Sequence, residues 1–390
     1  MSINVAIFFG GESVEHEISI ITANQALHAL NKETYQVMPV YVAKNRQLYT
    51  GEELYDLANY KDLNSLVSKL KQITIYKVDN QVHIYPVKRN LFQHKPLFTI
   101  DVAFPIMHGT NGEDGTIQGF LEMLKIPYVG CDVIAASAGQ DKVIMKHVFE
   151  NSNLPVIPWF WLYGHHYMKD EIYYNQKAMD LGFPVIVKPA SLGSSVGIEF
   201  AYDKESLKQA ILNASKYDSK LVIEKALSDF KEINCSVLGN RYEAQSSELE
   251  LIVQDGFLDY DGKYGQGSKG MVAAKRIVPA PLNENESKYI KDLALDTFMA
   301  LGASGVCRID FMKDEVTKQI YVNEINTIPG SLAYYLWSPV GLSFEQLLEK
   351  LIHIAIDNYR AKEKMTFSFE TNVLANFDGK GIKGSKGIKQ

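Results

Sequence analysis

The first chemically informative segment is a lysine followed by small residues, a combination suited to the phosphates of a nucleotide. Residues 188–197 read Lys-Pro-Ala-Ser-Leu-Gly-Ser-Ser-Val-Gly. Backbone N–H groups can close around phosphate oxygens where side chains are small, and the lysine supplies a point charge. The Gly-Lys-Ser/Thr of a Walker motif is absent from this run. Taken alone, the run also fits an ordinary hairpin turn.

A second group of polar residues lies inside two apolar runs near the C-terminal end. Residues 308–310 read Arg-Ile-Asp and residues 324–326 read Glu-Ile-Asn. Alternation along a strand places Arg308 and Asp310 on one face, and it likewise places Glu324 and Asn326 on one face. Two adjacent strands could therefore present hard oxygen ligands to Mg²⁺ beside a nucleotide, with an arginine nearby for developing negative charge. The alternative is two strands with their polar faces in water, which the apolar surroundings make less favourable.

Two loops combine histidine with acidic residues. Residues 10–17 read Gly-Gly-Glu-Ser-Val-Glu-His-Glu, and residues 108–116 read His-Gly-Thr-Asn-Gly-Glu-Asp-Gly-Thr. Both follow apolar runs that we interpret as strands, and the carboxyl ends of parallel strands are the usual binding edge of an open sheet. Considered separately, His16 and His108 are more often ordinary surface or hydrogen-bonded histidines.

The composition is that of a globular protein. The chain has 390 residues, 40 Lys and Arg against 46 Asp and Glu, a formal net charge of −6, and 46% hydrophobic residues. At ~150 residues per domain the length predicts two or three domains. These values exclude a single zinc module, a disulfide-stapled mini-protein and a disordered chain, and they do not indicate nucleic-acid binding.

The cellular context follows from the cysteines and the N-terminus. Cys131, Cys235 and Cys307 lie far apart without a CxxC pair, which argues against a zinc cluster and for a reducing compartment. The N-terminal apolar run is too short for an export signal or a membrane span. We expect a cytoplasmic protein without membrane insertion. Residues 379–390 alternate lysine with glycine and serine, which predicts a solvated, disordered tail or a weak anion contact.

The spacing of apolar residues predicts the strands and helices that must position these residues. Hydrophobic periodicity predicts strands over 4–9, 37–42 and 99–107 and a helix over 19–30, hence an open α/β sheet with glycine turns at strand ends. Residues 49–97 are less regular, with short strands expected over 72–78 and 81–87. Further along, strands are expected over 184–188, 220–224, 232–238, 242–250, 306–312 and 319–323, and helices over 287–301 and 344–359. This second part indicates an α+β unit with antiparallel sheets.

Taken together, these motifs resemble the D-alanine–D-alanine ligases of the ATP-grasp superfamily over about residues 3–355. The matching segments, in chain order, are 9–11 and 13–19, 108–109 and 112–119, 127–130, 141–142, 188–197, 224–225, 231–233, 260–264, 308–311 and 323–330. The resemblance implies a Rossmann-like N-terminal domain (1–130) and a two-lobed ATP-grasp, with a small lobe (131–223) and a large lobe bearing the metal site (224–370), followed by the tail (371–390).

The resemblance also implies an activity. ATP would phosphorylate the carboxylate of a first D-alanine, and the amine of a second would attack the acyl phosphate, giving a dipeptide for peptidoglycan precursor synthesis with release of ADP and phosphate. The implied cofactors are ATP and two Mg²⁺ or Mn²⁺, and the implied partners are small-molecule substrates and, by analogy, a second copy in a homodimer. Two other activities stay open: a related ligase with another acceptor, such as D-serine or D-lactate, and an inactive nucleotide-binding regulatory protein.

Residue roles follow from the same resemblance. Glu15 would hold the ammonium of the first amino acid and, with Ser194 and Tyr264, position the substrates, while His108 would lie near the first carboxylate. Arg308 and the Gly330 N–H would stabilise the tetrahedral oxyanion. Residues expected to bind ATP are Lys142, Lys188, Ser195, Glu224, Lys225, Leu227, Glu232 and Lys263, and the expected metal ligands are Asp310, Glu324 and Asn326.

One position departs from the family pattern. Where these ligases carry a serine that holds the carboxylate of the second D-alanine, this chain has Tyr335, followed by Leu336. Either Ser331 or Tyr335 still binds a D-alanine carboxylate, or the bulk of the phenol ring selects a different acceptor.

The glycine-rich stretch between Asp259 and Ile277 has little apolar anchoring. A lid here would shield the acyl phosphate from water, with Lys263 and Tyr264 entering the site on closure. A surface loop without such a role is the alternative.

Overall fold

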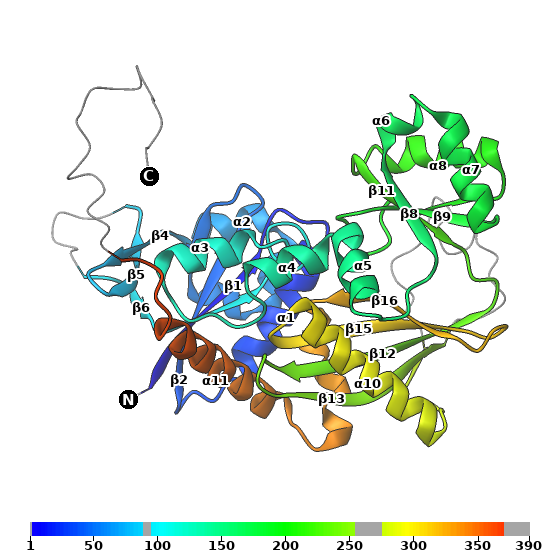
Figure 1. Cartoon of the computed structure of the whole chain (residues 1–390). Coiled ribbons are helices and arrows are strands. Elements are labelled where there is room, and N and C mark those ends of the chain that lie inside the picture. The colour runs from blue at the N-terminus through cyan, green and yellow to red at the C-terminus, as the bar shows by residue number, and fades with distance from the viewer. Residues whose placement is uncertain (1, 89–94, 254–274, 370–390) are drawn as a thin grey trace, which may run out of the picture.

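The computed structural model describes residues 2–88, 95–253 and 275–369, and these form three β-sheets with helices packed against them (Figure 1). The four-stranded sheet, with α6, α7 and α8, projects at the upper right of Figure 1, away from the body formed by the other two sheets. The expected mixture of α/β and α+β architecture is confirmed.

The N-terminal sheet has seven strands in the order β6-β5-β4-β3-β2-β1-β7. Its strands are β1 (Ile3–Gly10), β2 (Tyr35–Val42), β3 (Leu48–Thr50), β4 (Lys71–Val78), β5 (Gln81–Pro86), β6 (Phe98–Ile100) and β7 (Val102–Ile106). Only β2, β1 and β7 run parallel, and the other neighbours are antiparallel. The Rossmann-like part is therefore the β2-β1-β7 core, and residues 48–100 extend it as an antiparallel sheet.

The prediction of one continuous strand over 99–107 was wrong. The segment is interrupted at Asp101, and its two halves occupy opposite ends of the sheet order, β6 beside β5 and β7 beside β1. Asp101 accepts a hydrogen bond from the Asn4 backbone N–H through its side chain (2.8 Å) and donates its own N–H to the Asn4 carbonyl (3.0 Å). These two bonds fix the change of pairing partner, which apolar periodicity does not register.

Helices cover the N-terminal sheet, and one of them comes from the far end of the chain. They are α1 (His16–Ala29), α2 (Leu63–Lys69), α3 (Thr116–Leu124) and the 3₁₀ turns η1 (Glu52–Tyr55) and η2 (Leu57–Lys61). The C-terminal helix α11 (Phe344–Glu363) places Leu347 and Leu351 in the same buried core as Leu27 of α1 and Ile7 of β1. The loops that follow β1 and β7 carry the Glu15 and His108 motifs.

The second sheet has the antiparallel order β10-β9-β11-β8. Its elements are β8 (Trp159–Tyr163), β9 (Val185–Pro189), β10 (Glu199–Ala201) and β11 (Lys220–Lys225), with α6 (Gly164–Tyr167), α7 (Glu171–Leu181) and α8 (Lys204–Ala214). Its core is separate from the others. Lys188, near the end of β9, directly precedes the small-residue loop.

The third sheet has the order β14-β13-β12-β15-β16 and is antiparallel throughout. Its strands are β12 (Phe230–Gly239), β13 (Ala244–Val253), β14 (Lys275–Ile277), β15 (Gly305–Asp314) and β16 (Ile320–Asn326), followed by η3 (Gly330–Leu336) and η4 (Ser338–Val340). Helix α10 (Glu284–Leu301), α4 (Val133–Gln140) and α5 (Lys142–Asn151) share its hydrophobic core. The expected domain boundaries at 130, 223 and 370 stay predictions.

None of the helices that the structure describes combines the length and apolar character needed to cross a membrane.

Candidate active site

Three loops converge on Glu15. It follows β1, and its Oε1 accepts a hydrogen bond from the Ser194 hydroxyl (2.6 Å) in the loop after β9. A Cβ on Gly109, after β7, would lie 2.6 Å from Glu15 Oε2, so only glycine lets this loop approach so closely. The structure thus joins Glu15 and Ser194 as the sequence predicts, whereas Tyr264, expected to join them, lies outside the described residues.

The loop after β9 is built from unusual backbone conformations. Ser194 and Ser195 have φ values of 53° and 57°, and both are exposed. Two such residues in succession turn the chain sharply and cost of order 1–2 kcal/mol each. Lys142 donates to the Leu192 carbonyl (2.8 Å) of the same loop and lies 3.7 Å from Glu324 Oε2. This lysine therefore links the small-residue loop to the acidic strand pair.

The acidic residues form one row across the third sheet. Pairing register sets Glu250 opposite Asn234, Asn234 opposite Asp310, and Asp310 opposite Glu324, across β13, β12, β15 and β16. Directly opposed residues point to the same face. The row explains how carboxylates far apart in the sequence share one surface.

Arg308 and Asp310 form a bidentate ion pair. Arg308 Nε donates to Oδ1 (2.6 Å) and a terminal nitrogen donates to Oδ2 (2.8 Å), while Asn326 Nδ2 donates to the same Oδ2 (3.0 Å). Burial raises the pKa of Asp310, and Arg308 opposes that rise. Burial of Arg308 alone would lower its pKa, but the Asp310 carboxylate outweighs it and raises the pKa above its ordinary value. The Arg308 guanidinium is therefore cationic and fixed in orientation. Two of its five N–H groups bind Asp310, so others can still donate to a further oxygen.

The donor set fits a hard divalent cation. Asp310, Glu324 and Asn326 are cross-strand or same-strand neighbours, and carboxylate and amide oxygens are the ligands that Mg²⁺ and Mn²⁺ prefer. Since the Asn326 amide nitrogen faces Asp310, its oxygen is the atom left for a metal.

A buried carboxylate, Glu224, lies between two lysines. Glu224 receives Lys188 Nζ on Oε2 (2.5 Å) and Lys146 Nζ on Oε1 (2.7 Å), with side-chain exposures of 2%, 11% and 1% for Glu224, Lys188 and Lys146. Burial favours the neutral carboxyl, but the two ammonium groups outweigh it and lower the pKa of Glu224 to about 2. Burial lowers the pKa of Lys146. The structure brings Lys188 and Glu224 together, and it adds Lys146, which the sequence analysis did not select.

The other residues expected to bind ATP are more dispersed. Lys225 is exposed at the end of β11, Leu227 is half-buried in the following turn, and Glu232 is half-buried in β12. Lys263 lies outside the described residues. These positions run from the end of β11 into β12, along the connection between the second and third sheets.

A buried carboxylate also connects the first sheet to the third. Glu113 accepts the Gly109 N–H on Oε2 (2.9 Å) and the Ile328 N–H on Oε1 (2.8 Å). Burial, reinforced by the nearby Glu15 carboxylate, raises the pKa of Glu113 to about 7 despite these bonds. Glu113 therefore ties the His108–Gly109 loop to the segment after β16.

His108 lies on the other side of that loop. Its Nε2 is 3.2 Å from the Thr22 hydroxyl, which accepts the Ser331 N–H (3.0 Å) at the start of η3. Burial, aided by the Arg308 charge, lowers the pKa of His108 to about 4, so the imidazole is neutral at neutral pH. Gly330 begins η3 directly before Ser331. The predicted oxyanion group and His108 are thus connected through α1.

Tyr335 does not present its hydroxyl as a simple replacement for serine. The phenol donates to Glu250 Oε2 (3.1 Å), and burial raises its pKa to about 12. Arg276 covers the ring, with Cζ 5.2 Å from the ring centroid. Leu336 is fully buried in the core, so its side chain packs and leaves only backbone atoms for a substrate.

Some residues of the site were missed from the sequence. Lys146 is one helical turn after Lys142, a spacing that could have revealed it. Glu113 was within a recognised motif without a role. Glu250 and Arg276 give no sequence signal, because only sheet register and the packing of η3 bring them beside Tyr335.

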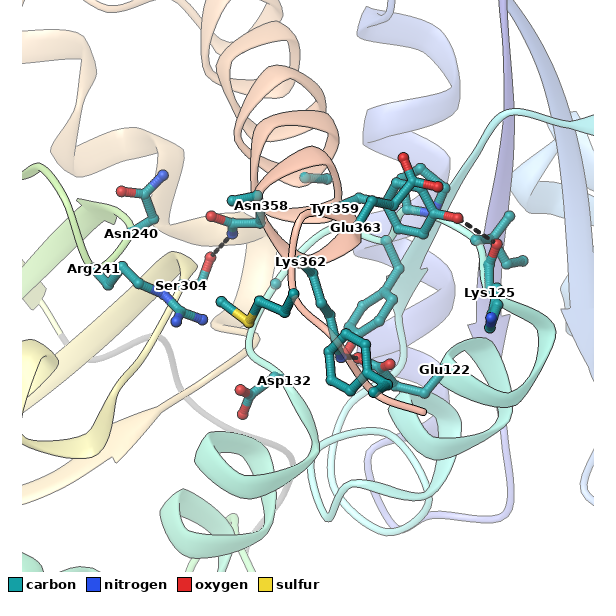
Figure 2. Close-up of a pocket in the computed structure, with 18 of the residues that line it drawn as sticks. Glu122, Lys125, Asp132, Asn240, Arg241, Ser304, Asn358, Tyr359, Lys362 and Glu363 are labelled. Carbon is teal, nitrogen blue, oxygen red and sulfur yellow. Dashed lines mark hydrogen bonds and ion pairs between the residues drawn. The ribbon is translucent and has the colours of Figure 1, made fainter. Parts of the chain in front are cut away.

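A separate cavity of about 720 Å³ lies elsewhere in the molecule (Figure 2). Figure 2 shows Asn240, Arg241 and Ser304 on one side and Glu122 and Lys125 on the other, with α11 between them. None of the predicted site residues lines it. It is therefore not part of the candidate active site.

Comparison with known proteins finds two family profiles along the chain. Residues 4–131 match the family profile described as D-ala D-ala ligase N-terminus, and residues 148–353 match D-ala D-ala ligase C-terminus. A D-alanine--D-alanine ligase of Thermosipho africanus is 41% identical over 372 residues, covering 95% of this chain and 98% of that protein. The chain belongs to the D-alanine–D-alanine ligase family.

Solved structures of ligases agree with this family membership. The D-alanine-D-alanine ligase of Coxiella burnetii superposes with a TM-score of 0.79 at 29% identity, covering 93% of this chain and 96% of that chain. The VanG D-Ala:D-Ser ligase of Enterococcus faecalis has a TM-score of 0.76 at 26% identity, covering 91% and 100%. The D-alanine–D-alanine ligase family thus accounts for the fold of nearly the whole chain.

Proposed function

We propose that this chain is an ADP-forming, ATP-dependent D-alanine–D-alanine ligase that supplies a dipeptide for peptidoglycan precursors. The observation that carries the proposal is the loop after β9, which contacts Glu15 through Ser194 and the acidic strand pair through Lys142. An amino acid held at Glu15 and phosphates held by the lysines would meet at this loop.

The reaction joins two amino acids in two steps. A carboxylate oxygen of the first D-alanine attacks the γ-phosphorus of ATP, the bond to the β-γ bridging oxygen breaks, and ADP leaves. The amine nitrogen of the second D-alanine then attacks the acyl carbon, the carbon–oxygen bond to phosphate breaks, and the amine loses a proton. The protein must therefore hold two amino acids and a nucleotide and exclude water.

The chain's own residues are assigned as follows. Glu15 holds the first ammonium, Ser194 fixes the Glu15 carboxylate, and neutral His108 lies near the first carboxylate. Arg308, held cationic by Asp310, and the Gly330 N–H stabilise the oxyanion that forms on amine attack.

The nucleotide is assigned to the interval between the second and third sheets. Residues proposed to bind it are Lys142, Lys188 and Ser195 for the phosphates, Glu224, Lys225 and Leu227 for the adenine, and Glu232 for the ribose. Asp310, Glu324 and Asn326 would hold two Mg²⁺ or Mn²⁺. When bound, these ions would neutralise negative charge on the phosphates. Lys263 and Tyr264 are assigned to the lid from sequence alone, and a homodimer is proposed by analogy.

The other activities considered are less well supported. Relatives that match at 35–41% identity carry the name D-alanine--D-alanine ligase, which favours D-alanine over another acceptor. An inactive regulatory protein is disfavoured by the intact pairs Arg308–Asp310 and Lys188–Glu224.

The test is product formation by the full chain. With ATP, Mg²⁺ and D-alanine we expect ADP release in a coupled assay and D-alanyl-D-alanine by mass spectrometry, whereas L-alanine should give neither. Arg308→Gln should lower turnover by about 10²–10³-fold, and the exposed Arg241→Gln should not. ADP release without dipeptide, or no response to D-alanine, would reject the proposal.

A further inference from the structure

A cation lies at one end of the polar row of the third sheet. Arg276 of β14 lies over the Tyr335 ring, 5.2 Å from Cζ to the ring centroid, and one terminal nitrogen is 3.4 Å from Glu250 Oε1. Its side chain is 52% exposed, whereas the Glu250 side chain is fully buried. The Arg276 guanidinium therefore contacts Glu250 and Tyr335, and about half of the side chain is open to solvent.

Glu250 is bound from three directions. The Asn234 amide (3.1 Å) and the Tyr335 hydroxyl (3.1 Å) both donate to Oε2, and Arg276 lies against Oε1. Among the residues that the structure describes, no hydrogen bond to Oε1 meets good geometry, so Arg276 supplies the compensating charge there. The contact with Glu250 fixes the orientation of the arginine.

The position of this pair relative to the reacting groups follows from sheet register. Glu250 stands opposite Asn234, which stands opposite Asp310, the partner of Arg308. Neighbouring strands are ~4.8 Å apart, so Glu250 and Asp310 are separated by roughly 10 Å along the row. An acceptor whose amine attacks beside Arg308 carries its carboxylate only a few ångströms further, so the Arg276 side chain must reach across the rest of that separation. Burial raises the pKa of the Tyr335 phenol, and the charges of Arg308 and Arg276 both act on the phenol to lower it.

The opposite direction is already occupied. On the other side, the Arg308 charge acts on His108, and the neighbouring Gly109 lies against Glu15. The proposed function assigns this region to the first amino acid. Tyr335 cannot present a free O–H to an incoming carboxylate because it donates to Glu250. Ser331 donates its backbone N–H to Thr22, so only its hydroxyl could serve a carboxylate.

We propose that Arg276, stacked on Tyr335 and held by Glu250, binds the carboxylate of the acceptor amino acid and makes the enzyme select an acceptor with a carboxylate next to its amine. A guanidinium can bind a carboxylate through two parallel N–H groups. Tyr335 then acts as a platform for Arg276. This inference rests on the proposed function.

The test compares two acceptors that differ only in the carboxylate. In the full-length enzyme with ATP and D-alanine as donor, D-alanine and D-alaninamide are offered as acceptors, and the ratio of their kcat/KM values is measured. We expect the wild type to prefer D-alanine and Arg276→Gln to lose about 10- to 200-fold of that preference, with the KM values of donor and ATP changed less than about 3-fold. Arg241→Gln is the matched loss of an exposed arginine and should retain the ratio.

Two further variants separate recognition from folding. Arg276→Lys keeps the charge and should retain part of the preference. Arg276→Gln with Glu250→Gln removes both charges, so it avoids an unpaired buried carboxylate and should still lack the preference. An unchanged ratio in Arg276→Gln, or in the folded double variant, would overturn the assignment.

The first half of the reaction distinguishes this inference from the proposed function. Hydroxylamine traps an acyl phosphate as a hydroxamate, with release of phosphate, and needs no acceptor amino acid. Hydroxamate formation from D-alanine and ATP together with an unchanged acceptor ratio would reject the role of Arg276 alone. Absence of hydroxamate and of dipeptide in the wild type would reject the proposed function itself.

Discussion

Replacing Lys146 with methionine tests the buried charge group formed by Glu224, Lys146 and Lys188. Methionine has a similar length and an apolar end, so Lys146→Met removes one of the two cations bound to Glu224 while preserving volume. The carboxylate stays buried, with Lys188 as its remaining lysine partner among the described residues. Both stability and nucleotide binding should respond.

The expected magnitude follows from the geometry. Removing one partner of a buried ion pair costs about 3–5 kcal/mol when the other charge is left unpaired. Because Lys188 Nζ remains 2.5 Å from Glu224, we expect the lower end, about 3 kcal/mol, in the free energy of unfolding. ATP binding should also weaken, since Lys188 would then neutralise Glu224 alone and be less available to the phosphates. A rise of about 10-fold in the KM for ATP corresponds to ~1.4 kcal/mol.

The assay pairs urea-induced unfolding at pH 7 with initial-rate kinetics. Lys208→Met is the matched control, since Lys208 pairs with Glu171 at 2.7 Å but both side chains are more than one-third exposed; a surface pair contributes ~0–1 kcal/mol. Equal losses of stability in the two variants, or an unchanged KM for ATP in Lys146→Met, would refute the reasoning.

Three other perturbations test separate parts of the structure. Glu324→Gln should lower turnover by at least ~10²-fold at saturating Mg²⁺, whereas the exposed control Glu243→Gln should keep near wild-type turnover. If Glu324→Gln also kept near wild-type turnover, Glu324 would not be a metal ligand. Glu113→Gln tests the carboxyl whose pKa is raised to about 7: because the folded protein holds that proton more tightly than the unfolded chain, wild-type stability should fall as pH rises from about 4.5 to 7, by ~3 kcal/mol. The melting temperature of Glu113→Gln should therefore rise relative to wild type between pH 5 and pH 8, and parallel pH profiles would contradict the assignment. In Gly305→Ala the new Cβ would lie 2.8 Å from Gly130 Cα, at a φ of 80°. The free energy of unfolding should therefore drop by about 2 kcal/mol or more. An unchanged urea midpoint would show that the backbone at Gly130 moves away from residue 305 without cost.

The pattern of apolar and polar residues predicted most helices and strands, because side-chain direction repeats with a fixed period along each element. The alternation around Arg308 and Asp310 fixes their common face in β15 whatever the rest of the chain does. Helix α11 was expected from its periodic leucines, and a capping box at Ser343 sets its start. The family motifs likewise indicated the chemistry, since residue types and order are properties of the sequence.

Tertiary structure decided what depends on register and on long-range approach. Nothing local to Asp101 shows that one apolar run splits between two sheet positions, because the cause is its bonding to Asn4, which is 97 residues away. Lys146 joins the Lys188–Glu224 pair only because the fold buries it against Glu224. Arg276 reached Tyr335 because β14 pairs with β13 and η3 packs beside them. The sequence by itself determined which chemical groups this protein carries. The fold decided which of these groups are close enough, and buried enough, to act on one another. The reason is that Coulomb and hydrogen-bond energies depend on distance and desolvation and not on position along the chain.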